Sequence, residues 1–220
     1  MTADSYPILY AFRRCPYVMR TRIVLSYSNI SYILRGIELK NKPSSMLEIT
    51  EKATVPVMQF PDGNVLDNSL DIIYYALEKN DPEHWFDLPT EEKDKIRNLI
   101  ALYDTEFVYL LNRYKYFEKH PEKTQEEYRE NIETDFLVEM NSLLESQSYI
   151  MSDNISLADI AIFPLMRQFA FADKEWFFNS EYGNIIRWIE SFLEHSIFKQ
   201  IMEKHPIWQE GESGILINGG

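Results

Sequence analysis

One thiol dominates the chemistry that this sequence could perform. Cys15 is the only cysteine, and it ends a short polar loop just before a predicted helix. Pro16 follows, and proline suits the first helical position because its φ is already helical and its missing N–H would be unbonded there. We therefore expect Cys15 at the N-cap, with Arg13, Arg14 and Arg20 nearby. This environment favours the thiolate and lowers a cysteine pKa from about 8.5 to roughly 3.5–7.5.

Two interpretations of Cys15 stay open at this point. A reactive thiolate would attack a disulfide sulfur or an electrophile, whereas a buried structural cysteine is inert. The same ambiguity applies to four nearby arginines, which either bind an anion or neutralise part of an acidic surface: Arg13, Arg14, Arg20 and Arg22.

The charge and composition of the chain limit its partners. It has 220 residues and a formal net charge of −13, which repels nucleic acids and anionic membrane surfaces, so neither is an expected partner. No apolar run approaches the roughly 20 residues needed to cross a bilayer, and the first residues do not resemble a secretory signal. A single cysteine suits a reducing compartment, so we expect a cytoplasmic location. The histidines show no metal-ligand spacing, so no metal is expected.

Strand and helix patterns alternate in the first part of the chain. The patterns indicate two strands and an intervening helix: residues 8–12, 31–35 and 17–27. We expect the strands to be parallel and joined by a right-handed crossover. A strand-like stretch follows at 53–60, but Pro56 inside it cannot donate to a ladder. A cis Val55–Pro56 bond would explain this, and a trans proline at the strand start is the alternative.

A hairpin and a polar helix start come next. Pro61–Asn64 predicts a tight turn, because Gly63 can adopt a positive φ. Asn68–Ile72 then opens a helix. Its small polar side chains and its free N–H groups suit a carboxylate.

From residue 89 onward, apolar residues recur at helical spacing. Helices predicted over 90–114 and 124–147 should pair as an antiparallel hairpin. Ser156 and Asp159 form a capping-box signature, which we assign to stability rather than to catalysis. The last residues, 210–220, hold four of the seven glycines and are expected to be mobile or draped over the surface.

Taken together, these features resemble the glutathione transferases, and more narrowly the cysteine-type branch near the omega class and the two-domain glutaredoxins. The resemblance rests on Cys15-Pro16-Tyr17, on Val-Pro about 40 residues later, and on the run Leu66–Ile72. It implies an α/β thioredoxin-like N-terminal domain followed by an all-α helical C-terminal domain. The expected boundaries are a glutathione-binding domain at 1–82, a linker at 83–92, and a helical domain at 93–220 that lines the co-substrate site.

The resemblance also implies a role for each matching residue. Cys15 would be the active-site thiol, and the backbone of Val55 would pair with the cysteinyl part of glutathione like an added strand. Ser69 and the residue before it would hold the γ-glutamyl carboxylate, and Lys42 would reach the glycyl carboxylate. Asn68 stands where the family usually has Glu or Gln. The glutathione site implied in this way consists of Pro16, Tyr17, Lys42, Val55, Pro56, Asn68 and Ser69.

The wall of a second, apolar site has three candidates on the predicted helices. Tyr103, Phe107 and Met166 could contact an apolar co-substrate, and the alternative is that all three are plain core.

These inferences predict a glutathione-dependent thiol transferase or oxidoreductase that acts through a Cys15–glutathione mixed disulfide. Val18 stands where a dithiol glutaredoxin has its second cysteine, so a monothiol cycle is expected. The partners would be glutathione and a small apolar or disulfide co-substrate, and the resemblance implies a homodimer. Two alternatives stay open: a glutathione transferase that conjugates electrophiles, and a non-catalytic adaptor or regulator with the same fold.

Overall fold

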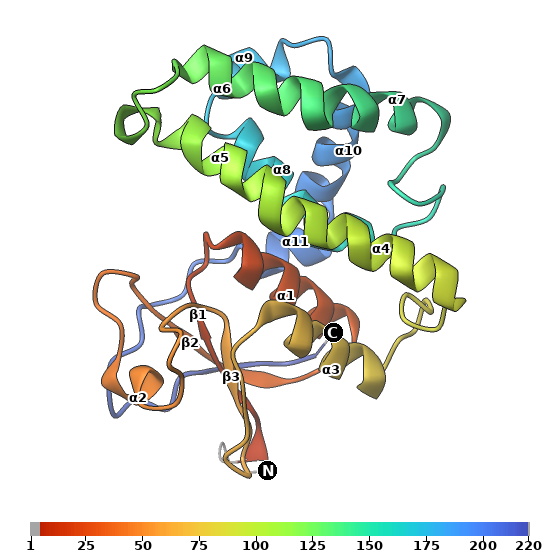
Figure 1. The fold of residues 1–220 in the computed structure, drawn as a ribbon. Coiled ribbons are helices and arrows are strands. Elements are labelled where there is room, and N and C mark those ends of the chain that lie inside the picture. Colours follow the sequence, from red (N-terminus) through yellow and green to blue (C-terminus); the bar gives the residue numbers. More distant parts are fainter. Residues whose placement is uncertain (1–4, 220) are drawn as a thin grey trace. The chain divides into compact units, whose positions relative to one another are not determined.

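The computed structural model describes residues 5–219, and they separate into two compact units (Figure 1). The first, here called the sheet unit, runs to Asp87 and takes in the chain again from Ser196. The second, here called the helical unit, is Leu88–His195. The predicted order, an α/β part followed by a helical part, is confirmed. The predicted boundary differs, because the chain from Ser196 onward packs with the sheet unit rather than with the helices of 93–195.

The sheet unit is built on five strands in the order β4-β3-β1-β2-β5. β1 and β2 are parallel, with Leu9 opposite Leu34, as the predicted crossover requires. β3 and β4 are antiparallel neighbours on the other side of β1. The elements of this unit are β1 (Ile8–Ala11), α1 (Pro16–Tyr27), β2 (Tyr32–Gly36), α2 (Ser44–Leu47), β3 (Val57–Gln59), β4 (Val65–Leu66), α3 (Ser69–Lys79), α11 (Ser196–Ile201) and β5 (Ile215–Ile217).

Strand β5 is the main departure from the sequence-based expectation. The tail was expected to be mobile or draped over the surface, yet β5 pairs antiparallel with β2, with Leu216 opposite Ile33. Upstream, the backbone N–H of Trp208 donates to Gly36 O at 2.8 Å. The tail therefore satisfies the edge of β2, where unpaired backbone groups would otherwise face solvent.

The helical unit consists of helices that bury aromatic side chains between them. The long helices predicted at 90–114 and 124–147 are present, and each contains one π-helical turn, at Tyr103–Phe107 and Glu133–Leu137. Among the described residues, no helix is long and apolar enough to cross a membrane. The α-helices of this unit are α4 (Thr90–Leu102), α5 (Val108–Lys115), α6 (Gln125–Ile132), α7 (Val138–Ser146), α8 (Leu157–Ala170), α9 (Lys174–Phe178) and α10 (Gly183–Glu194), with a 3-10 turn at Phe117–Lys119.

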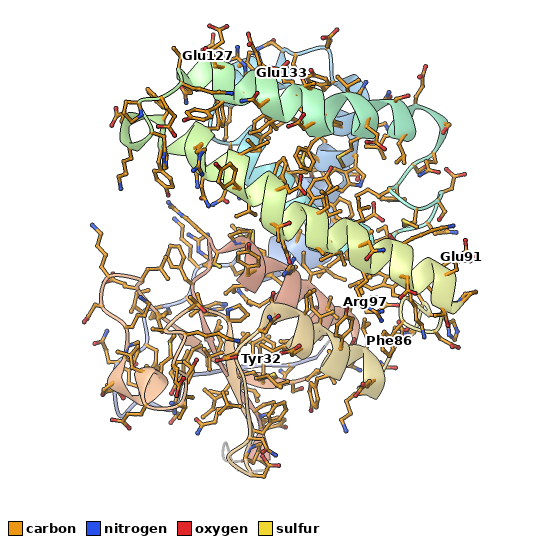
Figure 2. All side chains as sticks on the ribbon, viewed as in Figure 1. Tyr32, Phe86, Glu91, Arg97, Glu127 and Glu133 are labelled. Atoms are coloured by element: carbon orange, nitrogen blue, oxygen red, sulfur yellow. The ribbon has the colours of Figure 1, made fainter. Side chains whose placement is uncertain are left out.

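Two capping boxes fix helix starts in this unit. At α6, Thr124 and Glu127 exchange hydrogen bonds on the surface, where Figure 2 labels Glu127. At α8, the carboxylate of Asp159 accepts from the backbone N–H and the hydroxyl of Ser156 at 2.9 and 2.6 Å. Asp159 is fully buried and also accepts from the indole N–H of Trp188 at 3.0 Å. The predicted capping box at Ser156 is confirmed, and its contacts are those of a structural residue.

Candidate functional site

Cys15 lies at the N-cap of α1, as its spacing to Pro16 predicts. Its φ and ψ of −73° and 124° are extended, and Pro16 begins the helix. The loop before it is closed by a hydrogen bond from the N–H of Cys15 to Phe12 O at 2.9 Å. The end of β1 and the start of α1 therefore hold the thiol in one place.

The charge state of Cys15 differs from the sequence-based expectation. Burial raises the pKa of the Cys15 thiol, and hydrogen bonds from the backbone N–H groups of Val18 and Tyr17, together with the charge of Arg20, only partly offset this increase. The helix N-terminus thus acts in the predicted direction, but desolvation of the half-buried side chain outweighs it. The resulting group is a thiol rather than a preformed thiolate.

The thiol faces the backbone of a second segment of the sheet unit. Cys15 Sγ donates a long hydrogen bond, 3.7 Å, to Val55 O. The Val55–Pro56 peptide bond is cis, the first of the two arrangements that the sequence left open. Both residues are buried, and β3 begins immediately after them. The structure therefore brings Cys15 and Val55 together although 40 residues separate them.

Asn68 and Ser69 lie at the start of α3, and their side chains make different contacts. Asn68 is the N-cap, and its Oδ1 accepts from the N–H of Leu70 at 2.8 Å. This oxygen is therefore occupied, and the side-chain amide N–H groups are the part of Asn68 that could meet a ligand. Ser69 is buried, with 5% of its surface exposed.

Arg20 was predicted to lie near Cys15 and within a general anion patch, and the structure adds a contact with Ser69. It is buried on α1, and its Nε and Nη2 atoms donate to the hydroxyl oxygen of Ser69 at 3.1 and 2.8 Å. Because the oxygen of Ser69 accepts from a guanidinium, its own O–H remains able to donate to an anion. No spacing in the sequence links residues 20 and 69, so this contact could only be found in three dimensions.

Lys42 and Tyr17 complete the predicted set, and the backbone N–H of Tyr17 is one of the two that hydrogen-bond to the sulfur of Cys15. Lys42 lies in the loop before α2 and lines a cavity of about 270 Å³ that the tail residues Trp208 and Glu210 also line. The guanidinium of Arg20 lies 4.8 Å from the ring centroid of Tyr17. The glutathione-binding roles of Lys42 and Tyr17 stay predictions.

The three candidates for a co-substrate wall are buried inside the helical unit. Phe107 and Met166 have no exposed surface and Tyr103 has 5%. The rings of Tyr103, Phe107 and Phe136 pack against one another with centroids 5.1–5.2 Å apart. These contacts fit the plain-core alternative, because side chains at helical spacing on one face point into the interior of their own unit.

Known protein families and individual proteins are similar to this chain in both of its units. The family models described as glutathione S-transferase N-terminal and C-terminal domains match residues 9–85 and 122–191. A probable maleylacetoacetate isomerase of Caenorhabditis elegans is 30% identical over 185 residues, which cover 74% of this chain and 79% of that protein. Glutathione S-transferase omega-1 of mouse is 26% identical, over 71% of this chain and 64% of that protein.

A solved structure shares the fold. The glutathione S-transferase of Methylobacillus flagellatus, solved with glutathione bound, superposes with a TM-score of 0.75 at 20% identity. The match covers 89% of this chain and 98% of that one. The chain thus has a known fold, in which a helical domain follows a small sheet domain.

Proposed function

This chain belongs to the glutathione S-transferase family, and from that premise we propose that it transfers thiols through a Cys15–glutathione mixed disulfide. The observation that carries the proposal is the placement of Cys15. Its sulfur stands at the first turn of α1 and faces the backbone of Val55, the segment along which the cysteinyl part of glutathione would lie. A sulfur held there can meet the sulfur of a bound glutathionyl group.

The carboxylate of glutathione would be held at the start of α3. The buried Arg20 donates to the hydroxyl oxygen of Ser69, which leaves the Ser69 proton for the γ-glutamyl carboxylate. The first turn of α3 adds backbone N–H groups that favour an anion. Asn68 would offer its amide N–H groups, since its oxygen caps the helix.

The reaction has two exchange steps. Cys15 releases its proton to water, and its sulfur attacks the glutathionyl sulfur of a mixed disulfide. One S–S bond breaks, another forms, and the co-substrate leaves as a thiolate that takes up a proton from water. Glutathione thiolate then attacks the Cys15–glutathione disulfide, which releases glutathione disulfide and regenerates Cys15. Val18 in place of a second cysteine leaves the second step to glutathione.

The decisive experiment is intact-mass measurement after incubation with glutathione disulfide. Because Cys15 is the only cysteine, one adduct must lie on it. We expect a single glutathione adduct on the parent, its removal by reduced glutathione, and none on Cys15→Ser. A folded parent protein that forms no adduct would overturn the thiol-transfer mechanism.

Conjugation of glutathione to an electrophile is a second candidate, and the raised pKa of Cys15 favours it. A protonated thiol beside the sulfur of bound glutathione can donate a hydrogen bond that stabilises the glutathione thiolate. Serine also donates such a bond, so Cys15→Ser would retain conjugation of a chlorodinitrobenzene substrate while losing thiol transfer. If conjugation is the main activity, the parent and Cys15→Ser conjugate at comparable rates.

The family resemblance also leads us to propose a homodimer, which light scattering on the purified chain tests directly. A non-catalytic adaptor predicts weak or no glutathione binding, so retention of the parent on immobilised glutathione and its elution by free glutathione would count against that alternative.

A further inference from the structure

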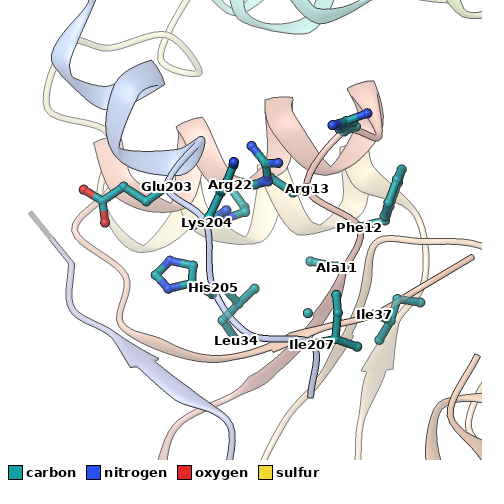
Figure 3. Close-up of a pocket in the computed structure, with 12 residues that line it drawn as sticks. Ala11, Phe12, Arg13, Arg22, Leu34, Ile37, Glu203, Lys204, His205 and Ile207 are labelled. Carbon is teal, nitrogen blue, oxygen red and sulfur yellow. The ribbon is translucent and has the colours of Figure 1, made fainter. Parts of the chain in front are cut away.

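A cavity of about 350 Å³ lies in the sheet unit, beside the loop that leads to Cys15. Its walls come from the ends of β1 and β2, from α1, and from the tail after α11. In Figure 3, Arg13, Arg22 and Lys204 lie along one side, and Leu34, Ile37 and Ile207 lie along the other. The cavity therefore has a basic side and an apolar side.

Arg22 is the buried cation of this cavity. It is 3% exposed, its Nε donates to the hydroxyl of Tyr32 at 2.9 Å, and its Nη1 donates to the carbonyl of Ile201. Both acceptors are neutral, and within residues 5–219 no carboxylate lies at ion-pair distance from it. A buried charge normally has a partner of opposite sign, so an anion in the cavity would supply what the protein does not.

The other basic side chains of the cavity are also available. Arg13 donates to Met202 O at 3.1 Å, which fixes its position without neutralising it. In the described part of the chain, neither Arg14 nor Lys204 has a hydrogen-bond or ion-pair partner. Glu203 is the one carboxylate among the described lining residues. This excess of positive charge stands in a chain whose net charge is −13.

His205 adds a polar group to the same cavity. Its Nε2 atom is buried and has no hydrogen-bond partner among the described residues. Burial and the charge of Arg22 lower the pKa of His205, so its ring is neutral at neutral pH. The positive charge of the cavity therefore comes from its arginines and its lysine, and His205 offers a hydrogen bond.

We propose that this cavity binds a small organic anion, with a carboxylate against its basic side chains and a short apolar body against Ile37 and Ile207. The basic side chains are Arg13, Arg14, Arg22 and Lys204. Carboxylate and guanidinium groups form strong charge-assisted hydrogen bonds, and the apolar side gains from covering its surface. The lining does not include Cys15, Val55 or Ser69, so the site is distinct from the proposed glutathione site. The four arginines that the sequence grouped together thus divide: Arg20 supports Ser69, and the other three line this cavity.

The test uses 4-ethylbenzoate, an aromatic carboxylate with a short apolar body, and its uncharged amide as a matched probe. Isothermal titration calorimetry on the full chain should detect the acid and find the amide at least about fivefold weaker, because only the acid makes charge-assisted bonds. The double variant Arg14→Gln, Lys204→Gln should weaken the acid by about fivefold or more. Since neither Arg14 nor Lys204 has a hydrogen-bond or ion-pair partner among residues 5–219, the fold should be unchanged by circular dichroism.

Two further variants sharpen the result. Lys123→Gln removes the same kind of charge from the helical unit and should leave the affinity unchanged. Ile207 is 43% exposed, so Ile207→Glu is tolerated and should abolish binding by placing a carboxylate in the apolar side. The proposal fails if the parent does not bind the acid, if acid and amide bind equally, or if the variants at Arg14 and Lys204 bind like the parent.

A competition experiment with glutathione distinguishes this proposal from the one for Cys15. An excess of glutathione should leave the affinity for 4-ethylbenzoate unchanged, and displacement would place the probe in the glutathione site and overturn a separate cavity site. Failure of thiol transfer is read independently, from the absence of an adduct on Cys15.

Discussion

At the scale of single residues, two opposing effects set the pKa of the Cys15 thiol. The first turn of α1 and Arg20 favour the thiolate, while burial favours the thiol, and burial prevails. The sequence could predict the first influence, because proline after cysteine marks a helix start. It could not predict the second, because burial depends on chain segments as distant as Val55.

The first prediction concerns the pH dependence of Cys15. The pKa is raised, so the thiolate fraction near pH 7 is smaller than in the unfolded chain, and it grows as pH rises toward the folded pKa. We expect alkylation by iodoacetamide to be slower than in the urea-unfolded chain at pH 7, and to increase about tenfold per pH unit below the folded pKa. The alkylation rate at each pH is measured by quenching samples at successive times and quantifying the alkylated protein by mass spectrometry. A plateau already present at pH 7 would show instead that the thiolate is preformed.

The second prediction concerns Ser69. Ser69→Ala removes the oxygen that accepts two hydrogen bonds from the buried Arg20. We expect the free energy of unfolding to fall by about 1–3 kcal/mol, and retention on immobilised glutathione to weaken. Ser44→Ala is the matched control, because Ser44 is exposed and its hydroxyl donates to the exposed Glu210. Equal effects of the two changes on glutathione retention would remove Ser69 from the proposed site.

At the scale of elements, the two capping boxes use one sequence pattern in two environments. Thr124 and Glu127 lie on the surface, where water can replace each lost hydrogen bond. Asp159 is buried and connects Ser156 to Ile150, whose N–H donates to it at 2.8 Å, and to Trp188. The same pattern is found at both helix starts, but burial determines how much each capping box contributes to stability.

The third prediction compares amide substitutions in these boxes. Asp159→Asn turns one acceptor oxygen into a donor facing donors, so we expect a loss of about 2–4 kcal/mol in unfolding free energy. Glu127→Gln keeps an oxygen that can accept from Thr124 on the surface and should cost less than about 0.5 kcal/mol. Chemical denaturation of both variants gives the two values. Similar losses for the two variants would contradict the argument from burial.

Local signals explain which elements the sequence predicts correctly. The parallel pair β1 and β2, the hairpin at Gly63 and the start of α3 at Asn68 each carry their own turn, cap or periodicity. Strand β5 has no such signal, because a three-residue strand between Gly214 and Asn218 acquires its structure only from pairing with β2. The contact between Arg20 and Ser69 could not be predicted from the sequence for the same reason, because it joins two helices that are not adjacent in sequence.

At the scale of the whole chain, the tail returns to the sheet unit and is anchored at several points. Trp208 donates to Gly36 O, and its ring lies under the guanidinium of Arg35 at 4.3 Å. The carboxylate of Glu210 accepts from the backbone N–H of Ser45 at 3.0 Å. These contacts place the basic and apolar residues of the tail beside the cavity of Figure 3, so the proposed anion site depends on the tail being docked.

The fourth prediction tests that docking through two glycines of the tail. Gly214 has a φ of 86°, and an added Cβ would lie 2.6 Å from the side chain of Ile33 and 3.0 Å from Leu34 O. Gly211 has nearly the same φ, 89°, but nothing lies within 4 Å of an added Cβ. Alanine at either position is strained by roughly 1–3 kcal/mol, so the difference between the two variants isolates the clash with β2.

We expect Gly214→Ala to displace β5, because the carbonyl of Leu34 belongs to a paired strand and cannot move away as a flexible side chain could. Amide hydrogen exchange at Ile215–Ile217 should therefore be much faster than in Gly211→Ala, and 4-ethylbenzoate should bind more weakly if the cavity needs a docked tail. Exchange that is equally slow in both variants would mean that β2 adjusts to the new methyl group. Since β1 and β3 pair on the far side of β2 from β5, their amides serve as the internal reference in both proteins.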